Sequence, residues 1–166
     1  MNQSYIDECK QIQQNATYSA ETHHRMAARD RRLSTWLQIV PAIVATITSG
    51  LVASGVSPSS LLWLTVTAAA ISAVASIWNP QKSYQDNLAA AKGFTTIKHD
   101  ARFLHEAQSI SMTEAEFRLA VQHLHDKYNE LVKVVPATDP DMFEEAQQVI
   151  QAGRHEPDRN SDGKIT

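Results

Sequence analysis

Residues 33–81 form an uninterrupted run of 49 residues without a formal charge, and this run limits what the chain can fold into. The 15 lysines and arginines and the 18 acidic residues all lie in residues 1–32 or 82–166. A helix of about 20 apolar residues crosses the roughly 30 Å of hydrocarbon in a bilayer. We therefore expect two membrane-spanning helices, at 34–54 and 60–78, joined by a short turn.

The charges that flank the run predict how it is oriented. Four arginines closely precede the first span and two lysines follow the second, whereas the connecting turn has no charge. These residues are Arg25, Arg29, Arg31, Arg32, Lys82 and Lys92. Because cytoplasmic segments of membrane proteins carry an excess of lysine and arginine, both chain termini are predicted in the cytoplasm. Trp36, Trp63 and Trp78 fall near span ends, where amphipathic rings favour the interface.

Two other arrangements of the uncharged run stay open. One is a hairpin buried inside a soluble helical bundle, and the other is a hidden hairpin that inserts into a membrane only on activation. A core helix rarely lacks a polar face over its full length. That pattern favours the membrane-spanning interpretation over both alternatives.

The spans are rich in small and hydroxyl-bearing residues, which let helices approach closely in lipid. Five of them are candidates either for helix packing or for lining a water path: Thr46, Ser49, Thr65, Ser72 and Ser76. Pro41 removes one backbone donor from the first span and is predicted to kink it. We treat Pro41 as a candidate hinge.

The flanking segments are predicted to be amphipathic helices, because apolar residues recur in them at steps of three and four. The predicted helices cover residues 3–32, 80–107, 113–135 and 139–152. Boundary signals are Asn79–Pro80, a capping box of Thr113 with Glu116 or of Ser111 with Glu114, Asp139–Pro140, and Gly153. The apolar stripes give a candidate assembly seam, either between these helices or between subunits: Tyr84, Leu88, Phe117, Val121, Leu124, Tyr128 and Leu131.

The predicted fold class is therefore all-α, a membrane protein with a two-helix transmembrane hairpin and an amphipathic cytoplasmic helical bundle. We expect one domain over residues 1–152 and a disordered tail over 153–166. The tail contains Asp158, Asn160 and Asp162, which match the first half of a calcium loop. The last ligand of such a loop would fall beyond Thr166, so weak calcium binding is kept only as an alternative.

Catalytic and metal chemistry find no support in the sequence. The seven histidines lack the i, i+4 spacing of a helical metal pair, and Cys9 is the only cysteine. There is no phosphate-binding glycine loop or nucleophile motif. Basic residues are not interleaved with aromatics in a way that tracks phosphates. We expect no enzyme, no cofactor, no metal and no nucleic-acid partner.

The order of the segments resembles the SLATT family, two-span proteins of bacterial conflict systems. The resemblance rests on Tyr18, the histidine pair 23–24, Arg31–Arg32, Asn79–Pro80 and the segments SYQDNLAAAKGFTTIKHDAR, DKYNELVKVVP and FEEAQQVI. It implies a membrane effector of antiphage defence in the bacterial inner membrane. Members are thought to form pores or disrupt the membrane when a sensor, often a nucleotide-signal system, triggers them.

The expected partners are therefore membrane lipid, further copies of the chain, and a sensor or signal-generating protein. Two spans cannot enclose a pore, so pore formation requires a homo-oligomer. The alternative function is a membrane-anchored adaptor, in which the hairpin only anchors the chain and the cytoplasmic helices bind a partner protein.

Overall fold

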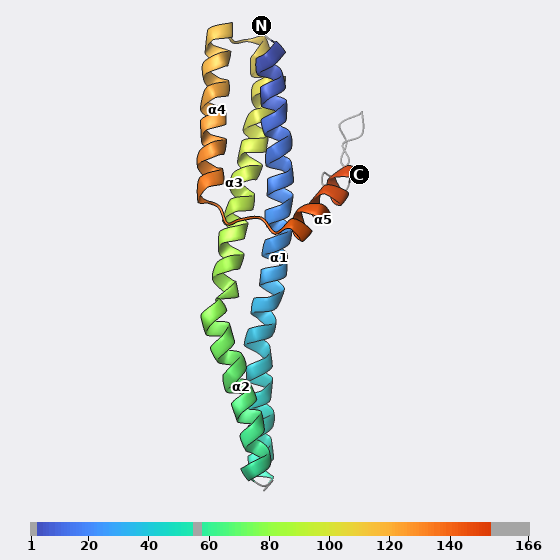
Figure 1. The fold of residues 1–166 in the computed structure, drawn as a ribbon, viewed down its shortest axis with the longest axis vertical. Coiled ribbons are helices and arrows are strands. Elements are labelled where there is room, and N and C mark those ends of the chain that lie inside the picture. Colours follow the sequence, from blue (N-terminus) through green and yellow to red (C-terminus); the bar gives the residue numbers. More distant parts are fainter. Residues whose placement is uncertain (1–2, 55–57, 154–166) are drawn as a thin grey trace. The chain divides into compact units, whose positions relative to one another are not determined.

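The structure, a computed structural model, describes residues 3–54 and 58–153 (Figure 1). Every regular element in these residues is helical, which confirms the all-α class for this part of the chain. The elements are α1 (Gln3–Ala53), α2 (Pro58–Trp78), α3 (Pro80–Glu106), the 3₁₀ turn η1 (Gln108–Ile110), α4 (Glu114–Val134) and α5 (Pro140–Gln151). The tail that resembles a calcium loop lies outside the described residues.

The junction between α2 and α3 is a single residue, Asn79. Its backbone has φ of 45°, in the left-handed region that asparagine tolerates better than most residues. Its side-chain Oδ1 accepts a hydrogen bond from the backbone N–H of Lys82 at 3.2 Å. Pro80 begins α3 without needing a backbone partner. The predicted boundary at Asn79–Pro80 is confirmed.

The start of α4 is fixed by a reciprocal capping box. Thr113 Oγ1 accepts from the Glu116 N–H at 3.4 Å, and the Thr113 N–H donates to Glu116 Oε2 at 2.9 Å. The competing register with Ser111 is therefore wrong, because α4 begins at Glu114. The hydrogen bonds from the Thr113 hydroxyl and then its backbone lower the pKa of the Glu116 carboxyl.

Both ends of α5 also follow the sequence. Asp139 Oδ1 accepts from the Asp141 N–H at 3.1 Å, and Pro140 occupies the first helical position. At the other end Gly153 has φ of 69°, a conformation that an L-residue adopts only with strain. The Gly153 N–H donates to the Ile150 carbonyl at 3.0 Å, which closes the last turn.

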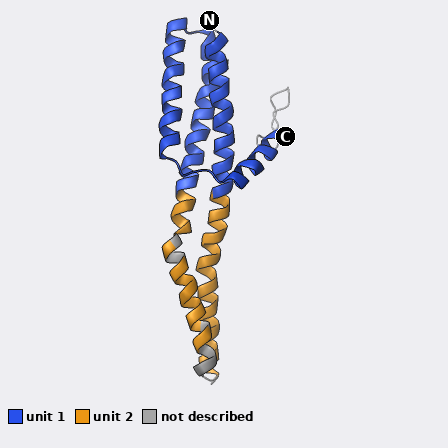
Figure 2. Cartoon of the chain, viewed as in Figure 1, with its two compact units in different colours: residues 1–26, 86–166 blue, residues 27–85 orange. Residues whose placement is uncertain are grey.

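The chain divides into two compact units (Figure 2). Unit 1 comprises residues 1–26 and 86–166, and unit 2 comprises residues 27–85. The predicted N-terminal helix over 3–32 and the predicted span over 34–54 are parts of one helix, α1, which runs without interruption from Gln3 to Ala53.

The core of unit 1 lies between α1, α3 and α4. Buried side chains from α1 are Cys9, Ile12, Ala16 and Ala20; from α3, Phe94, Ile97, Ala101 and Leu104; and from α4, Phe117, Val121 and Leu124. Phe94 is 2% exposed and packs its ring 5.9 Å from that of Tyr128. At Gly93 the helices approach closely, since a Cβ there would lie 3.0 Å from a methyl of Leu131.

One polar pair is buried in this core. The His23 ring is completely buried, stacks on Phe94 with centroids 5.7 Å apart, and places Nδ1 3.0 Å from Asn87 Oδ1. His23 Nε2 has no hydrogen-bond partner within the part of the chain that the structure describes. The histidine is therefore a packed core residue, and Asn87, itself 1% exposed, satisfies one of its nitrogens.

Helix α5 packs against the N-terminal part of α1. The rings of Phe143 and Tyr18 have centroids 6.2 Å apart, and Ala146 is completely buried. Arg25 Nη1 donates to Glu145 Oε2 at 2.9 Å, although this pair is partly exposed and contributes little to stability. The contacts hold α5 in unit 1 through one apolar stripe.

Truncation of the central aromatic residue should destabilise unit 1. We expect Phe94→Ala to lower the free energy of unfolding by about 3–5 kcal/mol, because it removes a buried ring and leaves a cavity. The measurement is thermal or denaturant unfolding of the detergent-solubilised chain, followed by circular dichroism. The matched control is Phe103→Ala on the same helix, where the ring is 58% exposed and the loss should be small. Equal losses would contradict this core.

The thiol of Cys9 should report opening of unit 1. Burial, and secondarily the charge of Glu8, raises the pKa of Cys9 to about 11, so the thiol stays protonated at pH 8. Since the thiolate is the nucleophile, alkylation should be about 100-fold slower than for an unshifted thiol, and slower still through burial. Iodoacetamide labelling with and without denaturant measures this. Rapid labelling of the folded chain would contradict the packing of Cys9.

Candidate membrane-facing site

Unit 2 presents an apolar surface that its own helices leave uncovered. By length and composition, α1 is the one helix among the described residues able to cross a membrane. Its most apolar 18-residue stretch has a mean hydropathy of 1.7 and contains no buried residue. In α2 the shorter described stretch Thr65–Val74 is also apolar.

The exposed side chains on this surface are large. On α1 they are Trp36, Ile39, Ile43, Ile47 and Val52, and on α2 they are Leu62, Trp63, Val66, Val74 and Ile77, with 45–88% of each exposed. Transfer of one such side chain from water into an apolar medium contributes about 1.5–3 kcal/mol. A helix buried in the core of a soluble bundle would show the opposite pattern.

Three of the candidate hydroxyl groups on this surface form hydrogen bonds within their own helices. Thr46 donates to the Ala42 carbonyl at 2.9 Å, Ser49 to the Ala45 carbonyl at 2.9 Å, and Ser72 to the Ala68 carbonyl at 2.9 Å. Thr46, Ser49, Thr65 and Ser72 are all exposed, and the side chain of Ser76 lies outside the described part. Such i−4 bonds let serine and threonine face hydrocarbon at low cost, since no donor is left unpaired.

Pro41 lies inside α1, which continues as an α-helix on both sides of it. The proline has no N–H to donate to the Leu37 carbonyl four residues earlier. One turn of α1 in the apolar stretch is therefore held by one backbone hydrogen bond fewer than its neighbours. A hinge at Pro41 stays a prediction.

A buried polar cluster lies in unit 2 just before the apolar stretch. Asp30 and Ser34 are 7% and 4% exposed. Ser83 Oγ donates to Asp30 Oδ2 at 2.6 Å, Ser34 Oγ donates to Gln81 Oε1 at 3.0 Å, and Arg29 Nε lies 3.6 Å from Asp30 Oδ1. These bonds join α1 to the first turn of α3. A buried carboxylate is tolerated here because it is hydrogen-bonded and lies beside a guanidinium.

This cluster was not predicted from the sequence. The available signal was the spacing of Asp30, Ser34 and Gln38, which are four residues apart and share one face of a helix. Gln38 Nε2 indeed donates to Ser34 Oγ at 3.3 Å. The partner of Ser34 is Gln81 and the partner of Asp30 is Ser83. Both partners lie some 50 residues further along the chain, so only the tertiary structure identifies them.

Most of the predicted assembly seam lies inside unit 1. Phe117, Val121 and Leu124 are buried, and Tyr128 and Leu131 pack against the same core. Leu88 in unit 1 and Tyr84 in unit 2 are half-buried. The sequence left open whether the seam packs between helices of one chain or between subunits. The α4 residues pack against helices of the same chain. A polar substitution there would unfold the bundle and give no information on assembly.

Comparisons with models of known protein families, with curated proteins and with solved structures gave no match.

The polar cluster should stabilise unit 2. We expect Asp30→Asn to lower the free energy of unfolding by about 1.5–3 kcal/mol, because it removes a charge-assisted hydrogen bond in a buried place. Thermal unfolding of the chain in detergent measures the loss. Asp126→Asn is the matched control, since Asp126 is exposed on α4. A loss no larger than that of the control would show that the cluster is not stabilising.

Proposed function

We propose that this protein is a homo-oligomeric membrane effector that permeabilises the bilayer. In this proposal the apolar parts of α1 and α2 insert as a transmembrane hairpin, with both termini in the cytoplasm of a bacterial cell. Several copies surround one axis, because two spans alone cannot enclose a pore. A sensor of an antiphage or other conflict system triggers the assembly.

The uncovered apolar surface of unit 2 is the observation that carries this proposal. The apolar stretch of α1 is flanked on its N-terminal side by exposed arginines, and Trp36 stands between the two. This order matches one half of a bilayer. Apolar side chains suit the hydrocarbon, an aromatic residue suits the interface, and basic residues suit the cytoplasmic side. The resemblance to the SLATT family supports the effector role, and the satisfied hydroxyls are compatible with both lipid and a water path.

A second candidate function, a membrane-anchored adaptor, is favoured by a separate observation. Unit 1 also exposes large apolar side chains, among them Leu119, Val132 and Val134 on α4 and Ile110 in η1, with 47–87% of each exposed. Exposed apolar residues on a bundle that already has a core are typical of surfaces that bind another protein. In this function the hairpin anchors the chain and no ion flux occurs.

Ion flux through liposomes separates the two functions. We expect the purified, inserted oligomer to release a trapped dye or carry ions. The pair Thr65→Val and Ser72→Ala should reduce that flux, because it removes two candidate pore-lining hydroxyls that lie seven residues apart on one line of α2. The control pair Thr48→Val and Thr67→Val, outside the candidate set, should leave the flux unchanged.

Insertion is measured in the same preparation by resistance to an alkaline wash. A chain that the wash removes contradicts the hairpin altogether. A well-inserted oligomer that carries no flux, even with its trigger, contradicts the pore and favours the adaptor. Equal losses in the test and control pairs would mean that the candidate hydroxyls do not line the path.

A further inference from the structure

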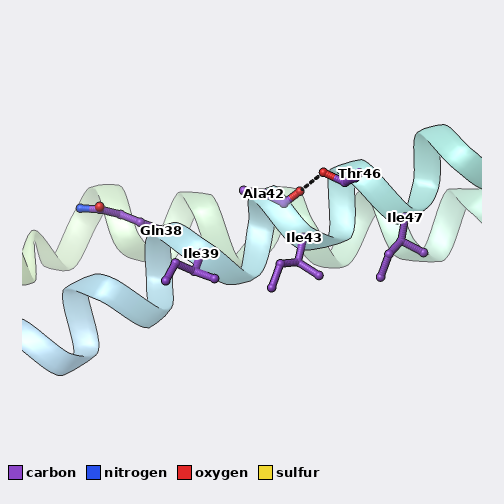
Figure 3. A pocket seen from close by; sticks show the side chains of 6 residues that line it. All are labelled: Gln38, Ile39, Ala42, Ile43, Thr46 and Ile47. Carbon is purple, nitrogen blue, oxygen red and sulfur yellow. Dashed lines mark hydrogen bonds between the residues drawn. The ribbon is translucent and has the colours of Figure 1, made fainter.

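A shallow groove runs along one face of α1 in unit 2. It has a volume of about 400 Å³ and is lined by Gln38, Ile39, Ala42, Ile43, Thr46 and Ile47. Figure 3 shows the lining as two rows of side chains, one of the three isoleucines and the other of Gln38, Ala42 and Thr46. Each row follows an i, i+4 ridge of the helix, and the small side chain of Ala42 leaves space between the ridges.

Two arginines lie on the same face, before the groove begins. Arg31 precedes Gln38 by seven residues, and Arg32 precedes Ile39 by seven residues. Seven residues make about two turns of an α-helix, so each pair lies on one line along the helix. The arginines and the groove therefore form a single strip of α1, basic at one end and apolar along the rest.

Neither of these two arginines has an ion-pair partner among residues 3–54 and 58–153. Within the described residues, Arg25 is bonded to Glu21 and Glu145, and Arg29 lies beside Asp30. Arg31 and Arg32 are exposed and form no ion pair in that part of the chain. A guanidinium presents paired N–H donors that match the oxygens of a phosphate. Arg31 and Arg32 are therefore free to bind an external anion.

We infer that this strip binds one anionic phospholipid, with the headgroup phosphate on Arg31 and Arg32 and one acyl chain in the groove. The inference rests on the proposed insertion of α1 into a membrane. Beyond insertion, the inference names the class of lipid that binds. The groove alone would accept the acyl chain of any phospholipid, whereas the two arginines favour a headgroup with net negative charge.

The dimensions of the strip fit this occupant. The groove extends over nine residue steps from Gln38 to Ile47, which is about 14 Å of helix. The hydrocarbon of one leaflet is about 15 Å thick. The arginines then lie outside the hydrocarbon, at the level of the headgroups. A soluble phosphate would use only the arginines, and a lipid that has no phosphate would use only the groove.

Trp36 supplies a local probe of the bound lipid. It is 64% exposed and stands between Arg32 and Ile39, three residues before the first isoleucine of the groove. The background variant carries Trp63→Phe and Trp78→Phe, so that all tryptophan fluorescence comes from Trp36. It is reconstituted into phosphatidylcholine vesicles that contain either brominated phosphatidylglycerol or brominated phosphatidylcholine. Bromine quenches the fluorescence on contact, and the difference gives the lipid preference.

We expect phosphatidylglycerol to quench Trp36 more strongly than phosphatidylcholine at equal content. Arg31→Gln and Arg32→Gln should each reduce that preference about fivefold, the effect of one basic residue near an anionic surface. Lys82→Gln is the matched control, because Lys82 is an exposed cation of the same unit on α3 and forms no ion pair in the described part. An equal reduction in the control would mean diffuse attraction and overturn the site.

A second pair of variants tests the groove itself. Ala42→Phe fills the space between the ridges and should weaken quenching by the anionic lipid. Ala45→Phe, at an exposed position of α1 outside the groove lining, should not. Loss of the preference on addition of millimolar inorganic phosphate would overturn the lipid as occupant in favour of a soluble anion.

An alkaline wash separates failure of this inference from failure of the proposed function. An inserted chain that both lipids quench equally overturns the lipid site and leaves the membrane effector intact. A chain that the wash removes contradicts insertion, and the lipid site falls with it.

Discussion

The described residues of unit 2 leave its apolar surface uncovered, and the placement of polar groups around that surface follows from this constraint. Ten large side chains on α1 and α2 stand exposed, among them Trp36 and Trp63. In water such a surface would drive aggregation, whereas in a bilayer it is the stable arrangement. The helical conformation suits such a surface, because a helix forms its backbone hydrogen bonds within the segment and needs no water as a partner.

The same constraint explains how polar groups are distributed near the apolar stretch. Hydroxyls inside it bond to carbonyls of their own helix, as Thr46 does to Ala42. Groups that need a partner from another segment are gathered at its edge, where Asp30 meets Ser83 and Ser34 meets Gln81. The buried Asp30 carboxylate is tolerated there because it accepts a hydrogen bond from Ser83 and lies beside Arg29. The edge thereby ties α1 to the start of α3, close in sequence to Arg31 and Arg32, which form no ion pair in the part of the chain that the structure describes.

Unit 1 follows ordinary globular rules. Its core is closed by apolar side chains from α1, α3 and α4, and its helix ends are capped by Thr113 and Asp139. The predicted seam residues Phe117, Val121 and Leu124 of α4 are buried in this core. They are therefore not available for contacts between copies of the chain. Contacts of unit 1 with a second molecule would therefore use the outer face, where Leu119 and Val134 are exposed.

The sequence by itself determined the helical fold class and most of the helix boundaries, because these depend on local chemistry. Apolar periodicity marked the buried faces of α3 and α4, and short capping motifs set the starts at Pro80, Glu114 and Pro140. Only the tertiary structure decided which distant residues meet. It paired Asp30 with Ser83 and His23 with Asn87, and it placed Phe117, Val121 and Leu124 of α4 in the core of unit 1. It also left Arg31 and Arg32 without an ion-pair partner among the described residues. Local patterns carry no information on such contacts, since a hydrogen bond between segments some 50 residues apart depends on how the helices pack.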